Sequence, residues 1–118
     1  MTQALVRLKT RADFLRVAAG RVRAVRDGLI VQAAPAPAGA AVRVGFTASR
    51  RVGNAVTRNR ARRRLRAAAA AVLAERGRPG VDYVLIARAA TAQRPYRALL
   101  ADLEGALRRL ERRPKEAE

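Results

Sequence analysis

Residues 43–66 contain no acidic side chain, and this absence is the strongest constraint on how the chain can fold. The stretch carries nine arginines, and Coulomb repulsion among so many guanidinium groups opposes a compact structure unless an outside anion compensates. A solvated helical face normally places acids four residues from its basic side chains, and none occur here. Because the arginine fork matches phosphate oxygens with two hydrogen bonds, the pattern favours a polyphosphate partner.

Local signals within this stretch predict a strand, a short basic loop and a basic helix. Residues 44–48 have few polar atoms and are expected to form the strand. The pair Gly53-Asn54 supports a turn with positive φ. The helix is expected to begin near Thr57 or Arg58, with the Thr57 hydroxyl accepting a hydrogen bond from a free backbone N–H as the N-cap.

The basic helix is expected to continue through an alanine-rich half to about Arg76, where Gly77 stops it. At about 100° per residue, only one narrow stripe of this helix can meet a core, and arginines cover the rest of its first turns. The stripe consists of Ala61, Leu65, Ala68 and Val72. Most charge runs are solvated surfaces, but the lack of compensating acids favours a face that meets an outside anion.

The remaining patterns predict a small number of further elements. Thr10 and Asp13 form a capping-box variant before a short helix that ends near Ala19 at Gly20. Residues 21–26 could pair as an additional strand. The other expected elements are a strand at 29–33, an exposed hairpin loop at 35–39, a returning strand at 42–48, a buried strand at 81–87 and an amphipathic helix at 96–110. Residues 1–9 are expected to be extended or loose, and 112–118 a frayed tail.

These elements predict a single domain, residues 1–118, of the α+β class, with helices packed on a small mixed sheet of three to four strands. The formal net charge of +17 favours nucleic acid as the partner, with an anionic membrane a distant second. The absence of cysteine and histidine removes disulfides, the commonest metal ligands and the commonest general base. No apolar run reaches the length of a membrane span, and we expect a cytoplasmic protein.

A catalytic site built from this chain is not expected. The acids are spread over caps, turns, strand starts and the outer face of the last helix, so no carboxylates converge for acid–base or two-metal chemistry. The segment VGNAVTRN lacks the spaced glycines and the Lys-Ser/Thr pair of a nucleotide-binding loop. Its helix N-terminus could still bind a backbone phosphate.

The triplet Arg58-Asn59-Arg60 is the sharpest local motif. Asparagine is a mediocre helix former, and its amide can both donate and accept hydrogen bonds. Asn59 could therefore contact RNA base edges or a 2′-hydroxyl, or orient a neighbouring arginine. The alternative is an early-helix asparagine chosen for capping.

The segment SRRVGNAVTRNRARRRLR resembles the signature of the bacterial ribonuclease P protein subunit. The resemblance extends to Asp13-Phe14 with Val17, to residues 43–46 and to residues 82–88, and so covers nearly the whole chain. It implies the small protein cofactor of an endoribonuclease, monomeric within a ribonucleoprotein, whose large catalytic RNA cuts the 5′ leader from precursor tRNA. It also implies that the RNA holds the Mg²⁺ ions. The implied fold is α-β-β-β-α-β-α with a left-handed βαβ crossover, a ribosomal protein S5 domain 2-like fold.

The resemblance also assigns roles to residues, none of them catalytic or metal-binding. Those implied to bind the ribozyme RNA are Arg50, Arg51, Asn54, Arg58, Asn59, Arg60, Arg62, Arg63 and Arg66. Those implied to form a leader-binding cleft between the sheet and the first helix are Phe14, Val17, Phe46 and Arg88. Family members often carry two further aromatics where this chain has Ala18 and Gln32, so fewer stacking platforms are expected for leader bases.

Two other classes of protein stay open. One is a general RNA-binding or ribosome-associated structural protein without a role in tRNA processing, and the other is a nucleoid-type DNA binder. Neither explains why a strand, a basic loop and a basic helix follow one another in this arrangement. Stimulation of precursor tRNA cleavage by a bacterial ribozyme RNA separates the three.

Overall fold

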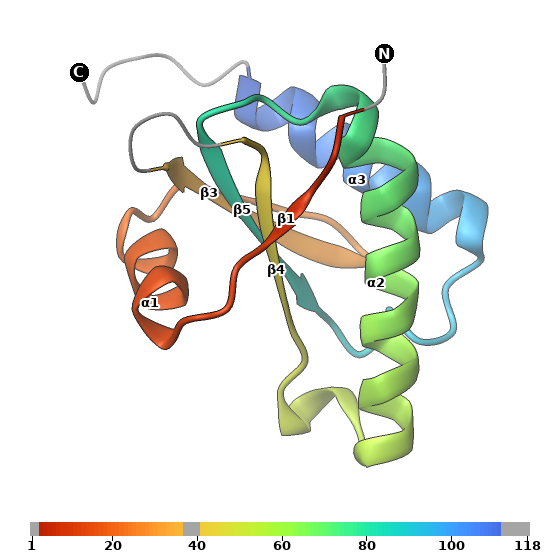
Figure 1. The fold of residues 1–118 in the computed structure, drawn as a ribbon. Helices are drawn as coiled ribbons and strands as arrows, with labels where there is room; N and C mark the ends of the chain where they lie inside the picture. The colour runs from red at the N-terminus through yellow and green to blue at the C-terminus, as the bar shows by residue number, and fades with distance from the viewer. Residues whose placement is uncertain (1–2, 37–40, 112–118) are drawn as a thin grey trace.

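The structure, a computed structural model, describes residues 3–36 and 41–111 of the 118-residue chain (Figure 1). The expected frayed tail and most of the expected loop at 35–39 lie outside these ranges. The elements in chain order are β1 (Val6–Arg7), α1 (Arg11–Ala19), β2 (Arg23–Val25), β3 (Leu29–Pro35), β4 (Arg43–Thr47), the 3-10 helix η1 (Arg50–Val52), α2 (Ala55–Arg76), β5 (Val81–Ala87) and α3 (Tyr96–Glu111).

The strands form one mixed sheet in the order β1-β4-β5-β3-β2, which confirms the α+β class. β5 lies in the middle, parallel to β4 and antiparallel to β3. The additional strand considered at residues 21–26 is present as β2, antiparallel to β3. The sheet has one strand more than the three or four expected, because the two residues of β1 pair in parallel with β4 and are too few to carry a period-2 pattern.

The expected hairpin between the strands at 29–33 and 42–48 is wrong. β3 and β4 are not neighbours, because β5 lies between them and pairs with both. Five of the seven residues of β5 are buried, so this strand needs a neighbour on each edge and a layer on each face. The most apolar strand therefore takes the centre of the sheet.

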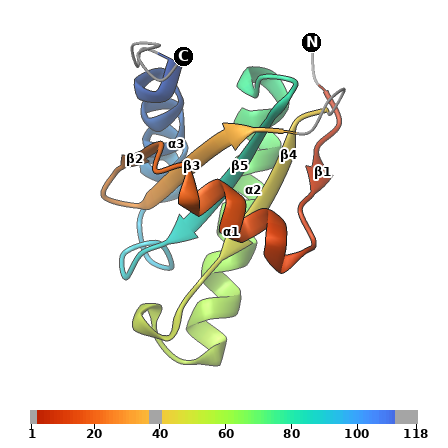
Figure 2. The same cartoon turned by 90° about the vertical axis from the view of Figure 1, so that its left-hand side faces the viewer.

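The connection from β4 through α2 to β5 joins two adjacent parallel strands. With the strands of Figure 2 followed from β4 to β5 and α2 behind the sheet, the crossover is left-handed. Almost all such connections are right-handed. The left-handed form places α2 on the face behind the sheet, and the basic loop and the start of α2 follow the end of β4.

The helices form two layers. Figure 2 shows α1 in front of the sheet and α2 and α3 behind it. The main core lies between the sheet and the two rear helices, and its fully buried members include Leu65, Leu73, Leu85, Leu99 and Leu103. Each such side chain contributes about 1.5–3 kcal/mol on burial. The stripe expected on α2 is confirmed, since all four of its residues are buried.

A much smaller cluster holds α1 on the front face. It consists of Leu8, Val17, Ala34 and Val84, with Phe14 and Ile86 packed against it. The Thr10 cap is confirmed, because its side-chain oxygen accepts a hydrogen bond from the Asp13 N–H at 3.1 Å. The helix ends at Ala19 before Gly20, as expected.

The expected N-cap of α2 is wrong. Asn54, and not Thr57, caps the helix, and the Asn54 side-chain oxygen accepts a hydrogen bond from the Thr57 N–H at 2.9 Å. Asparagine is a stronger N-cap than threonine, which explains the preference. The helix consequently begins at Ala55, two to three residues earlier than expected, and ends at Arg76 as expected.

Candidate nucleic-acid interface

The basic loop and the first turn of α2 lie at the end of the sheet where β4 and β5 finish together (Figure 1). Val52 of η1 is buried and anchors the loop, while its neighbours Arg50 and Arg51 are exposed. Gly53 has a φ of 149°, and a Cβ there would lie 3.0 Å from side-chain carbons of Thr57. The turn with positive φ is therefore confirmed at Gly53, and only glycine suits it.

Four arginines of this region point into solvent. Among the residues that the structure describes, their side chains make no hydrogen bond or ion pair, and all four are exposed: Arg50, Arg51, Arg63 and Arg66. Their forks remain available for an outside anion. Because exposed arginines without acids nearby repel one another, this surface gains stability when phosphates approach it.

The other polar residues of the basic loop and of the first turns of α2 make contacts within the protein that order the start of the helix. Arg58 donates to the Gly53 carbonyl at 3.2 Å, which closes the loop onto the helix. Arg62 donates to the Asn59 side-chain oxygen at 2.9 Å. Of the readings open for Asn59, the geometry favours the one in which it orients a neighbouring arginine. Asn54 uses its side-chain oxygen as the cap.

Arg60 and Arg64 point away from this surface, toward the connection between β5 and α3. The Nε of Arg60 donates to the Ala92 carbonyl at 2.7 Å, and the Nε of Arg64 donates to the Thr91 carbonyl at 3.0 Å. Arg64 also donates to the Arg94 carbonyl. The two guanidinium groups thus tie α2 to that connection. Sequence patterns could not show this, because the accepting carbonyls are 27 to 32 residues away.

A matched pair of variants separates these two kinds of arginine. We expect Arg64→Ala to lower the free energy of unfolding by about 2 kcal/mol, because carbonyls that accepted bonds from a charged donor lose it. Arg63→Ala should change stability by less than about 0.5 kcal/mol. It should instead lower the log–log salt slope of RNA binding by about one unit. Urea unfolding and salt titrations measure both, and equal stability losses in the two variants would contradict the assignment.

An ion-pair network that the sequence analysis missed holds α1 against the sheet. Asp82 of β5 is fully buried, and its two oxygens accept hydrogen bonds from Arg43 at 2.7 and 2.6 Å. Arg16 of α1 also donates to Asp82, and to the Pro35 carbonyl at 2.8 Å. Asp13 completes the network, with its Oδ1 3.3 Å from Arg16 and 3.5 Å from Arg43.

Burial and charge act in opposite directions on the pKa of Asp82. Burial raises the pKa, but hydrogen bonds from Arg43 and Arg16 outweigh it, so the pKa lies below its ordinary value. The pKa of Asp13 is also lowered, first by the hydrogen bond from Thr10. Both carboxylates are therefore ionised at neutral pH. A charged residue inside an otherwise apolar strand needs such partners, and this was the signal available in the sequence.

The structure brings together only part of the expected leader-binding cleft. Phe14 lies over β4, since a Cβ on Gly45 would be 2.5 Å from its ring. Val17 is fully buried and can support the cleft from beneath but not contact a ligand. Phe46 follows Gly45 and lies on the opposite face, packed at the margin of the main core with Arg7 5.2 Å from its ring centre.

The open part of the front face lies beside α1. Half-buried Ile30, Gln32 and Ile86 share this face, which gives Phe14 a partly apolar surround. Arg88 follows the end of β5 and donates to the Arg26 carbonyl at 2.6 Å. Single-stranded bases stack on aromatic side chains beside cationic groups. The front face, with Phe14 as its aromatic, is the surface that fits a single strand.

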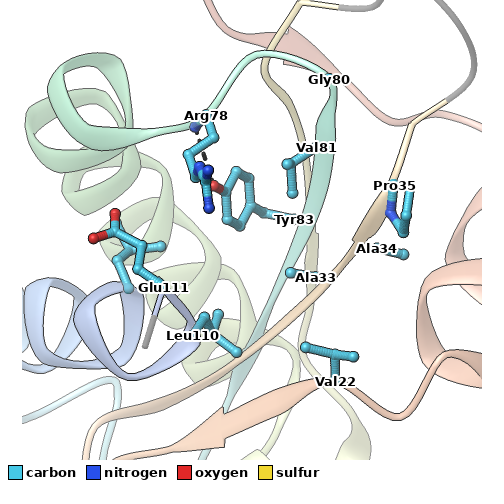
Figure 3. A pocket seen from close by; sticks show the side chains of 11 residues that line it. Val22, Ala33, Ala34, Pro35, Arg78, Gly80, Val81, Tyr83, Leu110 and Glu111 are labelled. Atoms are coloured by element: carbon cyan, nitrogen blue, oxygen red, sulfur yellow. Dashed lines mark hydrogen bonds between the residues drawn. The ribbon is translucent and has the colours of Figure 1, made fainter. Parts of the chain in front are cut away.

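A separate hollow of about 260 Å³ lies at the other end of the sheet, between β3, β5 and the last turns of α3 (Figure 3). Its lining is mostly apolar, with Tyr83 in its wall. The Tyr83 hydroxyl accepts a hydrogen bond from the Arg78 N–H at 3.1 Å, and burial raises the pKa of Tyr83. The tyrosine stays neutral at pH 7 and fixes the turn before β5. This hollow does not adjoin the arginine surface.

Two kinds of feature are absent from residues 3–36 and 41–111. No group of three or more histidine, cysteine, aspartate or glutamate side chains there could hold a metal ion. Within the same residues, no helix is both long enough and apolar enough to cross a membrane. The arginine surface and the front face are the candidate sites.

Comparison with known proteins agrees with this geometry. The family model described as Ribonuclease P matches residues 3–111. The chain belongs to the ribonuclease P protein family. This confirms the resemblance from which the site roles were taken, and the roles themselves remain predictions for experiment.

Relatives in this family match along most of their length. A ribonuclease P protein component of Paramagnetospirillum magneticum is 54% identical over 114 residues, 93% of this chain and 86% of the relative. That of Ruegeria pomeroyi is 56% identical over 106 residues, 87% of this chain and 84% of the relative.

Solved structures of RNase P proteins share the fold. The protein from Staphylococcus aureus is similar with a TM-score of 0.73 and 25% identity, over 90% of this chain and 94% of that one. The protein from Thermotoga maritima is similar with a TM-score of 0.74 and 22% identity, over 87% of this chain and 96% of that one. The second likeness concerns the fold alone.

Proposed function

We propose that this chain is the protein subunit of a ribonuclease P ribonucleoprotein and acts with its catalytic RNA in removing the 5′ leader of precursor tRNA, in the cytoplasm. Membership of the ribonuclease P protein family supports the assembly. The main observation in support of RNA binding is the surface of exposed arginines at the start of α2, with no acid between residues 43 and 66. That surface fits the phosphates of a large folded RNA.

In this proposal the protein contributes binding, and the RNA carries the chemistry together with its Mg²⁺ ions. The carboxylates with identified partners have structural tasks. Asp82 and Asp13 hold α1 against the sheet. Asp102 forms an ion pair with Arg94, whose guanidinium donates two hydrogen bonds to the carboxylate, one of them to Oδ1 at 3.1 Å. The arginine surface would hold the ribozyme RNA while the front face holds the leader. Two contacts on one rigid domain would place the leader relative to the catalytic RNA.

The deciding experiment combines the purified protein with a precursor tRNA and a bacterial ribozyme RNA at low Mg²⁺. We expect cleavage at the mature 5′ end to be faster with the protein than with the RNA alone. Protein treated with nuclease, and then freed of the nuclease, is the control and should cleave nothing without added ribozyme RNA. Tight binding of the ribozyme RNA without any stimulation would favour a general RNA-binding protein.

Phe14 tests the leader contact separately. Phe14→Ala should weaken binding of the holoenzyme to precursor tRNA by about 1–3 kcal/mol, because one stacking platform is lost, and leave binding of mature tRNA unchanged. Since the ring is only half-buried, the stability cost should stay below the 3–5 kcal/mol of a core phenylalanine.

The matched control for Phe14 is Leu15→Ala, which removes a neighbouring side chain of α1 that is 55% exposed. It should leave both affinities unchanged. Equal weakening of precursor and mature tRNA in the Phe14→Ala variant would assign Phe14 to the core alone.

A further inference from the structure

A second group of arginines lies at the edge of the sheet farthest from β1. Arg23 and Arg26 of the β2 region and Arg109 of α3 surround a hollow of about 370 Å³, whose other lining residues are Ala24 and Val25. β2 is the last strand of the sheet, three strands from β4. At about 4.8 Å per strand, roughly 14 Å separate it from the strand that leads into the basic loop. The hollow is therefore distinct from the arginine surface on α2.

Arg26 is the half-buried member of this group. Its guanidinium donates to the Gly105 carbonyl of α3 at 2.9 Å, and its own carbonyl accepts the bond from Arg88. The Nε of Arg26 is buried and has no hydrogen-bond partner among the described residues. A buried donor without an acceptor is unfavourable. Arg26 is thus held in place by α3 and also lines the hollow.

The positive charge of the hollow is not compensated within the part of the chain that the structure describes. The ion pairs there involve Arg16, Arg43 and Arg94, and none involves the three arginines of the hollow. No carboxylate lines the hollow. Three like charges at one place repel one another, so an anion would stabilise the arrangement.

Basic side chains on an edge strand often serve only to prevent pairing with another sheet. That purpose accounts for Arg23, which lies on the exposed edge. It does not account for Arg109, which comes from a helix, or for the cost of half-burying Arg26. Convergence of cations from two elements is typical of a site for an anion.

We propose that Arg23, Arg26 and Arg109, the β2-edge surface, bind phosphate groups of an RNA backbone and form a second RNA contact of this protein. This inference rests on the proposed function and adds a contact that lies apart from the signature helix and the front face. Phosphates of the ribozyme RNA and of precursor tRNA offer the same chemistry. The protein would then hold RNA both beyond the end of β4 and at the β2 edge of its sheet.

The test uses the double variant Arg23→Ala/Arg109→Ala, which leaves the half-buried Arg26 in place. The matched control is Arg76→Ala/Arg108→Ala, which removes two exposed arginines outside the hollow. One arm measures the salt dependence of binding to the ribozyme RNA alone. The other measures the salt dependence of precursor tRNA binding to the preassembled holoenzyme.

We expect the slope of log affinity against log salt concentration to fall by about 1.4 to 1.8 units for the test variant in one arm. The slope should fall by clearly less for the control variant. The arm in which the slope falls shows whether the β2-edge surface contacts the ribozyme RNA or the precursor tRNA. Slopes equal to the control in both arms overturn the inference. If the unaltered protein binds ribozyme RNA and stimulates cleavage, that result leaves the proposed function intact. If the unaltered protein does neither, the proposed function fails first.

Discussion

Replacing Asp82 with asparagine is expected to lower the free energy of unfolding by about 3 kcal/mol. The carboxylate is fully buried and accepts bonds from Arg43 and Arg16, so the neutral amide leaves both cations with only their longer ion pairs to Asp13. The value belongs at the low end for broken buried pairs, because both arginines reach solvent at one side. Domains of this size have only about 5–15 kcal/mol of stability, so the loss should be plain in urea unfolding.

Asp27→Asn is the matched control, because it changes an exposed aspartate in the same way and should cost less than about 0.5 kcal/mol. Acid provides a second check. The lowered pKa of Asp82 means that its contribution is present above the unfolded pKa of about 3.9 and is lost as the pH falls through the lower folded pKa. The difference between wild type and Asp82→Asn should thus stay constant above about pH 5 and shrink below pH 4. A difference that grew on acidification would contradict the network.

Removing the four free arginines of the signature region together should nearly abolish tight RNA binding. The variant carries alanine at Arg50, Arg51, Arg63 and Arg66, whose side chains have no partners among the described residues. Each phosphate contact adds roughly 0.7 to 0.9 to the log–log salt slope, so the slope should fall by about three units. At 0.1 M salt this corresponds to a loss of affinity of about 1,000-fold.

A control variant with four other exposed arginines replaced keeps the net charge equal. It carries alanine at Arg11, Arg76, Arg97 and Arg108. If binding depended only on the overall charge of the protein, the two quadruple variants would lose affinity equally. Thermal unfolding of both should match wild type closely, because none of the eight side chains has an identified hydrogen bond within residues 3–36 and 41–111.

The sequence was sufficient for the elements whose signals are local. The cap at Thr10, the stop at Gly20 and the apolar stripe on α2 each depend on neighbours within a few residues, and each is confirmed. The last helix ends within one residue of its expected limit, with Leu99 and Leu103 buried as the pattern required.

The failures concern long-range order. β5 lies between β3 and β4 because it is the strand with two apolar faces to cover. The short loop between β3 and β4 instead suggested that these two strands pair with each other as a hairpin. In the same way, helix periodicity could not show that Arg60 and Arg64 bind backbone carbonyls, since these acceptors lie on a distant connection. Phe46 was grouped with Phe14, although alternation along β4 puts successive residues on opposite faces.

The start of α2 at Ala55 has an electrostatic consequence. The aligned peptide dipoles of a helix place about half a positive charge at its N-terminus, where acids are stabilising and cations unfavourable. α2 has no acid in its first turn, and Arg58 follows within it. The helix dipole and the arginine side chains therefore add to the same positive potential, and the uncapped N–H groups point in the same direction. In the free protein this electrostatic repulsion is concentrated at the N-terminus of α2. A phosphate placed there would relieve the repulsion. The first turn of α2 should therefore become more resistant to fraying when RNA is bound.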